Sequence, residues 1–164
     1  MDANSLKNIP ARDIDKIPAE VNQYIVVGLG NEQYGIDIRY VDNIVRMQRI
    51  TRVPKMPNYL IGIINLRGEV LPVISLRLKM GLASDEYSKS TRIIILKTEQ
   101  EGTLGVIVDR VQEVVTLDNL HMDAVDDLKL EGKNFVVSVG KRDNGDLISV
   151  LDLNTISLDD IVQS

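Results

Sequence analysis

The sequence predicts a mostly β protein, either a sandwich or a set of small barrels, with a short helix at the carboxyl end. Roughly eight to ten short apolar runs are separated by Gly, Pro and polar turns along the chain. Residues 59–77 have the form strand, tight turn, strand. Asn144-Gly145 lies between two later apolar runs, and this dipeptide strongly favours a hairpin turn.

The first part of the chain predicts an arm followed by strands. Residues 1–19 mix charges, prolines and small residues without a sustained period, so we expect a mobile N-terminal arm. Residues 53–58 hold two prolines and should be a loop, because proline interrupts a ladder of hydrogen bonds. Strands are expected at 24–29, 33–38 and 41–46.

The segment 59–77 is the most informative part of the sequence. Two apolar runs, 59–65 and 70–74, flank a turn in which Gly68 is free to adopt a positive φ. Pro72 has no N–H to donate, so we expect its strand to lie at a sheet edge or to carry a bulge. The turn lifts Arg67 out of an apolar segment and makes it a candidate binding residue.

The second half continues the β pattern. A short helix or connector is expected at 76–82, and 152–162 has apolar residues near helical spacing, with Asp152 or Ser157 as its cap. Whether 117–130 is helix or loop stays open. Further strands are expected at 91–96, 104–109, 110–115, 135–139 and 147–151.

The composition predicts a cytoplasmic globular protein. Apolar residues make up 44% of the chain and aromatic residues only 4%, so aliphatic side chains must fill the interior. There is no cysteine, which excludes disulfides and thiolate sites. No apolar run approaches the roughly 20 residues that span a bilayer, and the N-terminus lacks the apolar core of a secretory signal.

Charge is unevenly distributed along the chain. The net charge of −5 argues against nucleic-acid binding, which depends on Lys and Arg. Residues 39–80 nevertheless hold eight basic and two acidic side chains. This basic segment either orients protein partners or simply solvates one face of the fold.

The residues that catalysis or metal binding would require are missing, so no catalytic residue, metal or cofactor is expected. His121 is the only histidine and has no neighbouring ligands at metal-binding spacing. Gly28-Leu29-Gly30 begins like a dinucleotide fingerprint, but the third glycine is absent. The acids at 123–127 lack the Gly and Glu of a calcium loop.

Separated motifs resemble the CheW family of bacterial chemotaxis coupling proteins. Gly62, Asn65-Leu66-Arg67-Gly68, Pro72 and Leu76-Arg77 stand in the order and spacing of the family signature. The resemblance extends over about residues 24–156. It also includes the segments 29–38, 105–111 and 150–153.

The resemblance implies two five-stranded SH3-like barrels around a shared core, within a domain at 20–164. One lobe would hold about 22–65 plus 145–160, and the other about 66–142. It implies a non-catalytic adaptor that joins the cytoplasmic tips of methyl-accepting chemoreceptors to the regulatory domain of a CheA-type histidine kinase, recruited to membrane-associated receptor arrays without inserting in the membrane. A receptor helical hairpin would pack between the barrels, and the kinase domain would dock barrel to barrel.

The family also implies binding residues at matching positions. Many relatives carry an acid where this chain has Asn43, and Asp42 in a strand would point to the opposite face. The expected receptor residues are Val41, Asn43, Ile44, Arg67, Val111 and Val114. The expected kinase residues are Ile36, Ile38 and Gly62.

Two alternative functions stay open from the sequence. The same fold serves as the regulatory module of a CheA-type kinase or as the coupling domain of a CheV-like protein. In another class, small β-barrels bind single-stranded nucleic acid by stacking bases on aromatic residues. The low aromatic content and the negative net charge disfavour that reading.

Overall fold

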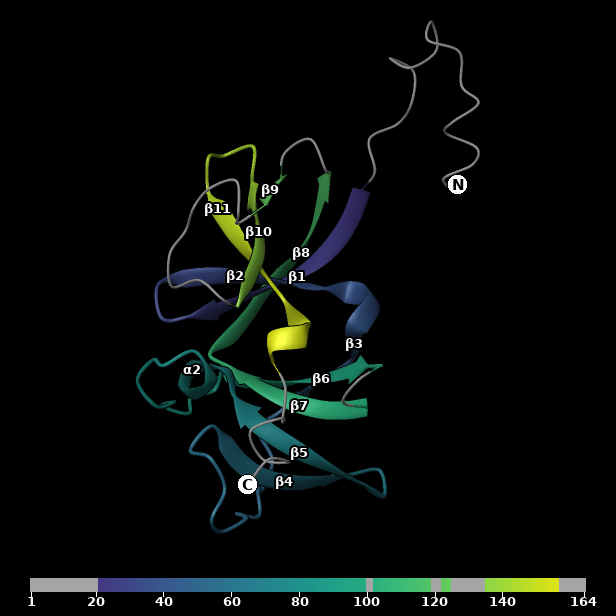
Figure 1. Ribbon diagram of the computed structural model, residues 1–164, viewed down its shortest axis with the longest axis vertical. Coiled ribbons are helices and arrows are strands. Elements are labelled where there is room, and N and C mark those ends of the chain that lie inside the picture. The colour runs from purple at the N-terminus through teal and green to yellow at the C-terminus, as the bar shows by residue number, and fades with distance from the viewer. Residues whose placement is uncertain (1–20, 100–101, 119–121, 125–134, 157–164) are drawn as a thin grey trace, which may run out of the picture.

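The computed structural model describes residues 21–99, 102–118, 122–124 and 135–156, which form two β-sheets (Figure 1). The six-stranded sheet consists of β1 (Val21–Leu29), β2 (Glu32–Asp37), β8 (Arg110–Asp118), β9 (Met122–Ala124), β10 (Val136–Lys141) and β11 (Leu147–Leu151). The five-stranded sheet consists of β3 (Val41–Arg46), β4 (Leu60–Leu66), β5 (Glu69–Ser75), β6 (Arg92–Thr98) and β7 (Gly102–Val108). The described helices are α2 (Leu76–Lys79) and two 3-10 turns, Ile38–Tyr40 and Leu153–Thr155.

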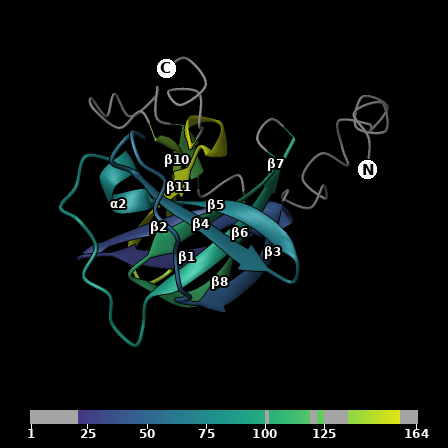
Figure 2. The same cartoon turned by 90° about the horizontal axis from the view of Figure 1, so that it is seen from below.

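The two sheets lie one above the other in Figure 1, and the view from below in Figure 2 looks through the five-stranded sheet toward the other. Their strand orders are β8-β1-β2-β11-β10-β9 and β3-β6-β7-β5-β4. Most neighbours are antiparallel, but β11 pairs parallel with β2 and β5 pairs parallel with β7. The mostly β prediction is therefore confirmed, although the described strands form open sheets rather than closed barrels.

An apolar cluster between the sheets, the shared core, joins the two halves of the molecule. Both sheets contribute, for example Val27 of β1 and Val106 of β7, which are fully buried. The predicted shared interior is present. Its buried members are Ile25, Val27, Leu29, Tyr34, Ile36, Tyr59, Ile74, Leu76, Ile94, Leu96, Leu104, Val106, Val108, Val136, Val139, Leu151 and Ile156.

The five-stranded sheet is apolar on both faces. Along β6, Ile94 and Leu96 pack into the shared core. Ile93 and Ile95 point to the opposite face because side chains alternate along a strand. There they join a second cluster, the inner core, made of Ile64, Leu71, Val73, Ile93, Ile95 and Ile107. Burial on both faces explains why β6 and β7 read as continuous apolar runs.

The hairpin of β4 and β5 has a two-residue turn. Leu66 pairs with Glu69, and both central residues have positive φ, 54° at Arg67 and 82° at Gly68. Two positive φ values define the tight turn that matches the twist of paired strands. The Asn65 side chain accepts a hydrogen bond of 3.1 Å from the Gly68 N–H. The predicted turn and the freedom of Gly68 are thus confirmed.

Pro72 does not place β5 at an edge, which corrects the sequence expectation. β5 lies between β4 and β7. Opposite Pro72, Ile63 exchanges both backbone hydrogen bonds with Thr51, at 2.8 and 2.9 Å, so β4 requires no donor from the proline. Pairing with β7 begins only at Val73. The expected bulge in the strand of Pro72 is not found either: the register shifts between Leu60 and Gly62, so the extra residue is in β4.

The sheets divide the chain at other points than the predicted lobes. The lobe limits of 22–65 plus 145–160 and 66–142 assigned β3 and β4 to the first lobe. Both strands instead pair within the same sheet as β5 to β7, and β8 to β10 pair within the sheet of β1 and β2. The limit at 65 falls inside the β4–β5 hairpin, whose two strands pair with each other. The arm at 1–19 lies outside the described residues.

The expected C-terminal helix is visible only at its beginning. Leu153–Thr155 forms a 3-10 turn, and the Asp152 side chain accepts a hydrogen bond from the Asn154 N–H at 3.0 Å. This confirms Asp152 as a cap. Residues 157–164, which include the alternative cap Ser157, lie outside the described part of the chain.

Candidate functional site

The first candidate surface, which we name the junction groove, is defined by Val41 and Ile44 of β3 and Val111 of β8. All three are half-buried and pack against the shared core. They come from strands that belong to different sheets. Half-buried aliphatic side chains leave apolar surface for a partner to cover.

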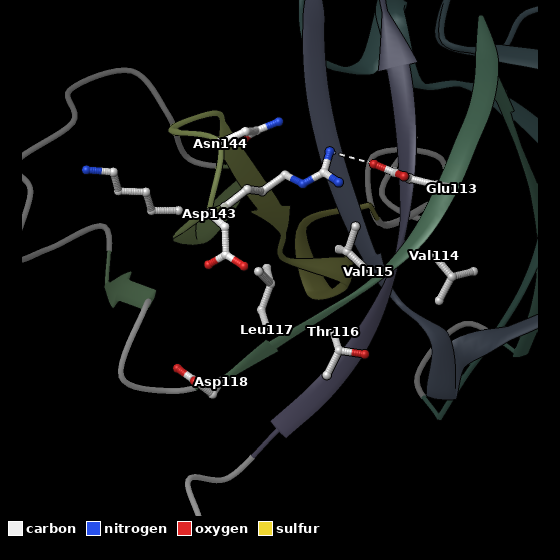
Figure 3. A pocket seen from close by; sticks show the side chains of 10 residues that line it. Glu113, Val114, Val115, Thr116, Leu117, Asp118, Asp143 and Asn144 are labelled. Carbon is white, nitrogen blue, oxygen red and sulfur yellow. Dashed lines mark ion pairs between the residues drawn. The ribbon is translucent and has the colours of Figure 1, made fainter.

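Val114 faces the same side of β8 as Val111. Val114 pairs with Ile25 and Val111 pairs with Val27, and both of these partners on β1 belong to the shared core. A register shift between the two pairs allows residues three apart on β8 to face the same side. Val114 is 51% exposed. Val114 lines a hollow of about 540 Å³ together with Val115 and Leu117, although Figure 3 shows its side chain on the opposite side of the strand from theirs. Val114 thus lies on the outer part of the groove wall.

Asn43 is half-buried on β3, and its side-chain oxygen accepts the Ile44 N–H at 2.8 Å. The neighbouring Asp42 sits at a register shift of the strand and pairs with Lys97 at 3.3 Å. Asp42 is thus engaged across the sheet with a basic partner from its own chain.

Arg67 lies apart from the groove, at the hairpin tip. Its side chain is exposed and forms no hydrogen bond or ion pair within the described residues. Its backbone occupies the left-handed region, which costs a non-glycine residue roughly 1 kcal/mol or more. β3 and β4 are at opposite edges of the sheet, so no strand pairing brings Arg67 to Val41 or Ile44.

The second candidate surface, the barrel opening, is a hollow of about 470 Å³ beside the start of β4. Met47, Ile50 and Ile61 give it an apolar floor that packs against the inner core. Tyr87, which is 54% exposed, stands at its rim. The remaining lining residues are Gln48, Arg52, Asn58 and Leu60.

Basic side chains surround the barrel opening. A neighbouring hollow that shares Met47 is lined by Arg46, Lys89 and Arg92. Arg46, Arg49 and Lys55 form no ion pair among the described residues. Arg46 and Arg52 of the basic segment, with Lys89 and Arg92, thus form a cationic rim beside an apolar centre, a surface that would orient a partner with an acidic rim.

The predicted kinase residues are less accessible than expected. Ile36 has no exposed surface and belongs to the shared core, so it cannot touch a partner in this structure. Ile38 is half-buried against the same core. Gly62 is buried, and a Cβ placed on it would lie 2.1 Å from the Thr51 carbonyl oxygen. Ile61, the residue before Gly62 in β4, lines the barrel opening, so Gly62 lies beside that hollow.

Sequence reasoning missed a mostly buried ion pair between Arg77 and Asp109. Arg77 donates to Asp109 at 2.8 and 2.5 Å, and both side chains are about four-fifths buried, with 19% and 20% exposed. These hydrogen bonds hold the pKa of Asp109 below its usual range. The signal was present, since each residue is a charge placed inside an apolar motif, but nothing in the sequence paired them.

The described residues contain no group of three or more His, Asp or Glu that could hold a metal ion. Within that same part of the chain, no helix has the length and apolar character needed to cross a membrane.

Comparison with known proteins agrees with this architecture. The family model of the CheW-like domain matches residues 23–159. The chain is 36% identical to the chemotaxis protein CheW of Helicobacter pylori over 137 residues, covering 84% of this chain and 82% of that protein. The corresponding protein of Bacillus subtilis is 32% identical, with 80% and 84% covered. The crystal structure of the scaffolding protein TtCheW from Thermoanaerobacter tengcongensis matches with a TM-score of 0.73 and 33% identity, over 81% of this chain and 90% of that one.

Proposed function

The chain belongs to the CheW-like domain family, and from this premise we propose that it is a non-catalytic adaptor joining chemoreceptors to a CheA-type histidine kinase. The receptors are the methyl-accepting transmembrane kind, bound at their cytoplasmic tips. The observation that carries the proposal is the presence of two distinct partly apolar surfaces on one small fold, the junction groove and the barrel opening.

The junction groove suits a helical partner. A helix laid in a groove contacts it through apolar residues spaced three or four apart. Val41 and Ile44 are three apart on one wall and Val111 lies on the other, all half-buried against the shared core. Val114 extends the second wall outward. We assign the receptor hairpin to this groove, with Asn43 at its border.

Arg67 provides a separate polar contact for the receptor. A guanidinium can donate two parallel hydrogen bonds to a carboxylate. Arg67 is exposed, has no partner in the described structure and is held at a strained backbone position. Strain of this kind persists where function maintains it, which supports a binding role.

The barrel opening suits the kinase regulatory domain. Its apolar floor and cationic rim match a partner face that is apolar at the centre and acidic at the edge. Gly62 permits the close approach of β4 to Thr51 that shapes this end of the sheet. Gly62 thus acts through the backbone, and Ile38 and Ile36 support the fold from the shared core.

Calorimetric titration with the regulatory domain of the cognate CheA-type kinase tests the proposal. We expect saturable one-to-one binding, weakened about tenfold or more by Tyr87→Glu because interface tyrosines often carry much of the binding energy. Leu147→Glu is the matched control, since Leu147 is 61% exposed on the other sheet. Absence of binding by the unmodified protein, or equal effects of the two variants, would contradict the assignment.

A further inference from the structure

Four residues from three separate segments meet where the chain passes from one sheet to the other. Asp109 is the single residue between β7 of the five-stranded sheet and β8 of the six-stranded sheet. Arg77 is in α2, which follows β5 of the five-stranded sheet. Gly30 is in the turn between β1 and β2 of the six-stranded sheet, and Arg110 begins β8.

Hydrogen bonds connect these residues across the junction. Asp109 accepts two from Arg77, at 2.8 and 2.5 Å, and one of 2.7 Å from the Gly30 N–H. Arg110 donates to the Gly30 carbonyl oxygen at 2.8 Å. The Asp109 N–H donates to the Gly28 carbonyl oxygen at 3.1 Å. The Asp109 carboxylate therefore connects α2, which follows the five-stranded sheet, to the β1–β2 turn of the six-stranded sheet.

The two glycines of the Gly28-Leu29-Gly30 sequence are explained by this arrangement. A Cβ on Gly28 would lie 2.4 to 2.6 Å from atoms of the Arg110 guanidinium, so a larger residue here would require the end of the Arg110 side chain to shift. Gly30 has a φ of 59°, and its turn presents both backbone groups to Asp109 and Arg110. The Gly28-Leu29-Gly30 sequence, which would otherwise suggest nucleotide binding, thus binds the side chains of Asp109 and Arg110.

The helix that carries Arg77 is fixed in place. Leu76 is fully buried in the shared core. Ser75, also fully buried, caps α2 by accepting the Leu78 N–H at 3.1 Å. Its hydroxyl donates in turn to Asp85. Because the buried Leu76 and the hydrogen bonds of Ser75 hold α2 in place, the helix presents the Arg77 guanidinium in one orientation.

We propose that Gly30, Arg77, Asp109 and Arg110 form an inter-sheet clamp that sets the angle between the sheets and thereby positions the walls of the junction groove. This inference rests on the proposed function, because the groove is the proposed receptor site. Val111, which lines one wall, is only two residues beyond Asp109. The other wall, β3, belongs to the opposite sheet.

The clamp has a role that the shared core cannot fill. Apolar burial stabilises contact between the sheets but is non-directional, so it tolerates rotation of one sheet against the other. A bidentate arginine–carboxylate pair fixes both distance and plane. Arg77 and Asp109 are positioning residues, and neither needs to touch the receptor.

The experiment measures sheet orientation and partner binding in the full chain. Amide residual dipolar couplings give the orientation of each sheet in Arg77→Lys and in Asp109→Asn, because a lysine keeps the charge but loses the planar fork. The matched control is Arg39→Lys. Arg39 also donates to a carboxylate from two side-chain nitrogens. Its partner Asp37, however, is only two residues away, where β2 ends and the connection to β3 begins.

We expect both clamp variants to keep each sheet intact while the couplings of the two sheets no longer fit one common orientation. Affinity for a soluble receptor-tip fragment should fall about tenfold, and affinity for the kinase regulatory domain should stay within about twofold. Arg39→Lys should change none of these. An unchanged orientation in both clamp variants, or equal losses for both partners, would overturn the clamp. If the unmodified protein binds no receptor fragment, the proposed function fails while the couplings still decide the clamp.

Discussion

The base and the tip of the β4–β5 hairpin contain the same kinds of residue in opposite circumstances. At the base, Gly62 touches the Thr51 carbonyl and Arg77, just beyond β5, is held by Asp109. At the tip, Gly68 has no atom within 4 Å of a built Cβ, and Arg67 is exposed without a partner. At the base, a glycine and an arginine are thus held by packing and hydrogen bonds. At the tip, the same two residue types are exposed and can contact a partner.

This contrast shows which motif residues serve the fold and which are free to bind. A charge that is mostly buried and doubly hydrogen-bonded stabilises the native state and is hidden from partners. A charge held out at a strained turn contributes nothing visible to the fold. Substitutions at the base should therefore cost stability, and substitutions at the tip should cost binding.

The largest effect is expected at Gly62. Gly62→Ala places a methyl group 2.1 Å from the Thr51 oxygen, which forces β4 away from Thr51 and should lower the free energy of unfolding by about 3 kcal/mol or more. Urea denaturation measures the loss. At the tip, Gly68→Ala meets only the penalty of its φ of 82°, about 1 kcal/mol. Similar costs at both positions would break the comparison.

The next effect is expected at Arg77. Arg77→Ala removes two charge-assisted hydrogen bonds and leaves a mostly buried carboxylate, so the free energy of unfolding should fall by about 2 kcal/mol. Arg39→Ala is the control, because its side chain is 67% exposed and solvent-exposed ion pairs contribute little to stability. Thermal or urea unfolding of the two variants side by side checks the difference. Equal losses in the free energy of unfolding for the two variants would mean that burial does not make the Arg77–Asp109 pair more stabilising than the exposed pair.

A smaller change, of opposite sign, is expected at the tip. Arg67→Asn relieves the left-handed backbone strain, so stability should rise by up to about 1 kcal/mol. Receptor-fragment affinity should fall in the same variant, by about 1–3 kcal/mol if a charge-assisted hydrogen bond is lost. Melting temperature and titration are measured on one preparation. Unchanged affinity would remove Arg67 from the proposed receptor contact.

The smallest effect is a pH dependence at the base, where two carboxylates behave oppositely. Hydrogen bonds from Arg77 lower the pKa of Asp109, whereas burial raises the pKa of Asp85. The stability due to Asp109 is complete above its unfolded pKa near 3.8 and is lost as pH falls through the lower folded pKa. For Asp85, stability is greatest below 3.8 and falls as pH rises through the higher folded pKa.

Two amide variants separate these contributions. Relative to the unmodified protein, Asp85→Asn should gain stability as pH rises from acid toward neutral, and Asp109→Asn should lose it. Urea midpoints measured across that range give both slopes. Slopes of the same sign would show that the two carboxylates are not in the contrasting environments that the structure gives them.

Most strands could be predicted because local chemistry defines them. Alternating or continuous apolar runs gave β1 to β8, β10 and β11 within a few residues, and Gly68 and Asn144-Gly145 marked two turns. β9 was not predicted, since Met122–Ala124 is only three residues long in an acidic stretch. How the strands divide between sheets depends on long-range pairing, which local patterns do not encode.

The candidate site was predicted in part for the same reason. Val41, Ile44 and Val111 each pack half-buried against the shared core, but their role as receptor contacts stays a prediction. Ile36 was chosen by its place in a motif, and its full burial shows that motif position does not reveal which face of a strand is covered. Arg77 and Asp109 are 32 residues apart, so their pairing appears only once the fold is known.

The most direct test of the account is whether two partners bind at once. The chain is first saturated with a soluble receptor-tip fragment and then titrated with the CheA-type regulatory domain, and the complex is sized by sedimentation. Because the junction groove and the barrel opening are lined by different residues, the account predicts a one-to-one-to-one complex with a kinase affinity within about threefold of that of the free protein. Displacement of one partner by the other would contradict it.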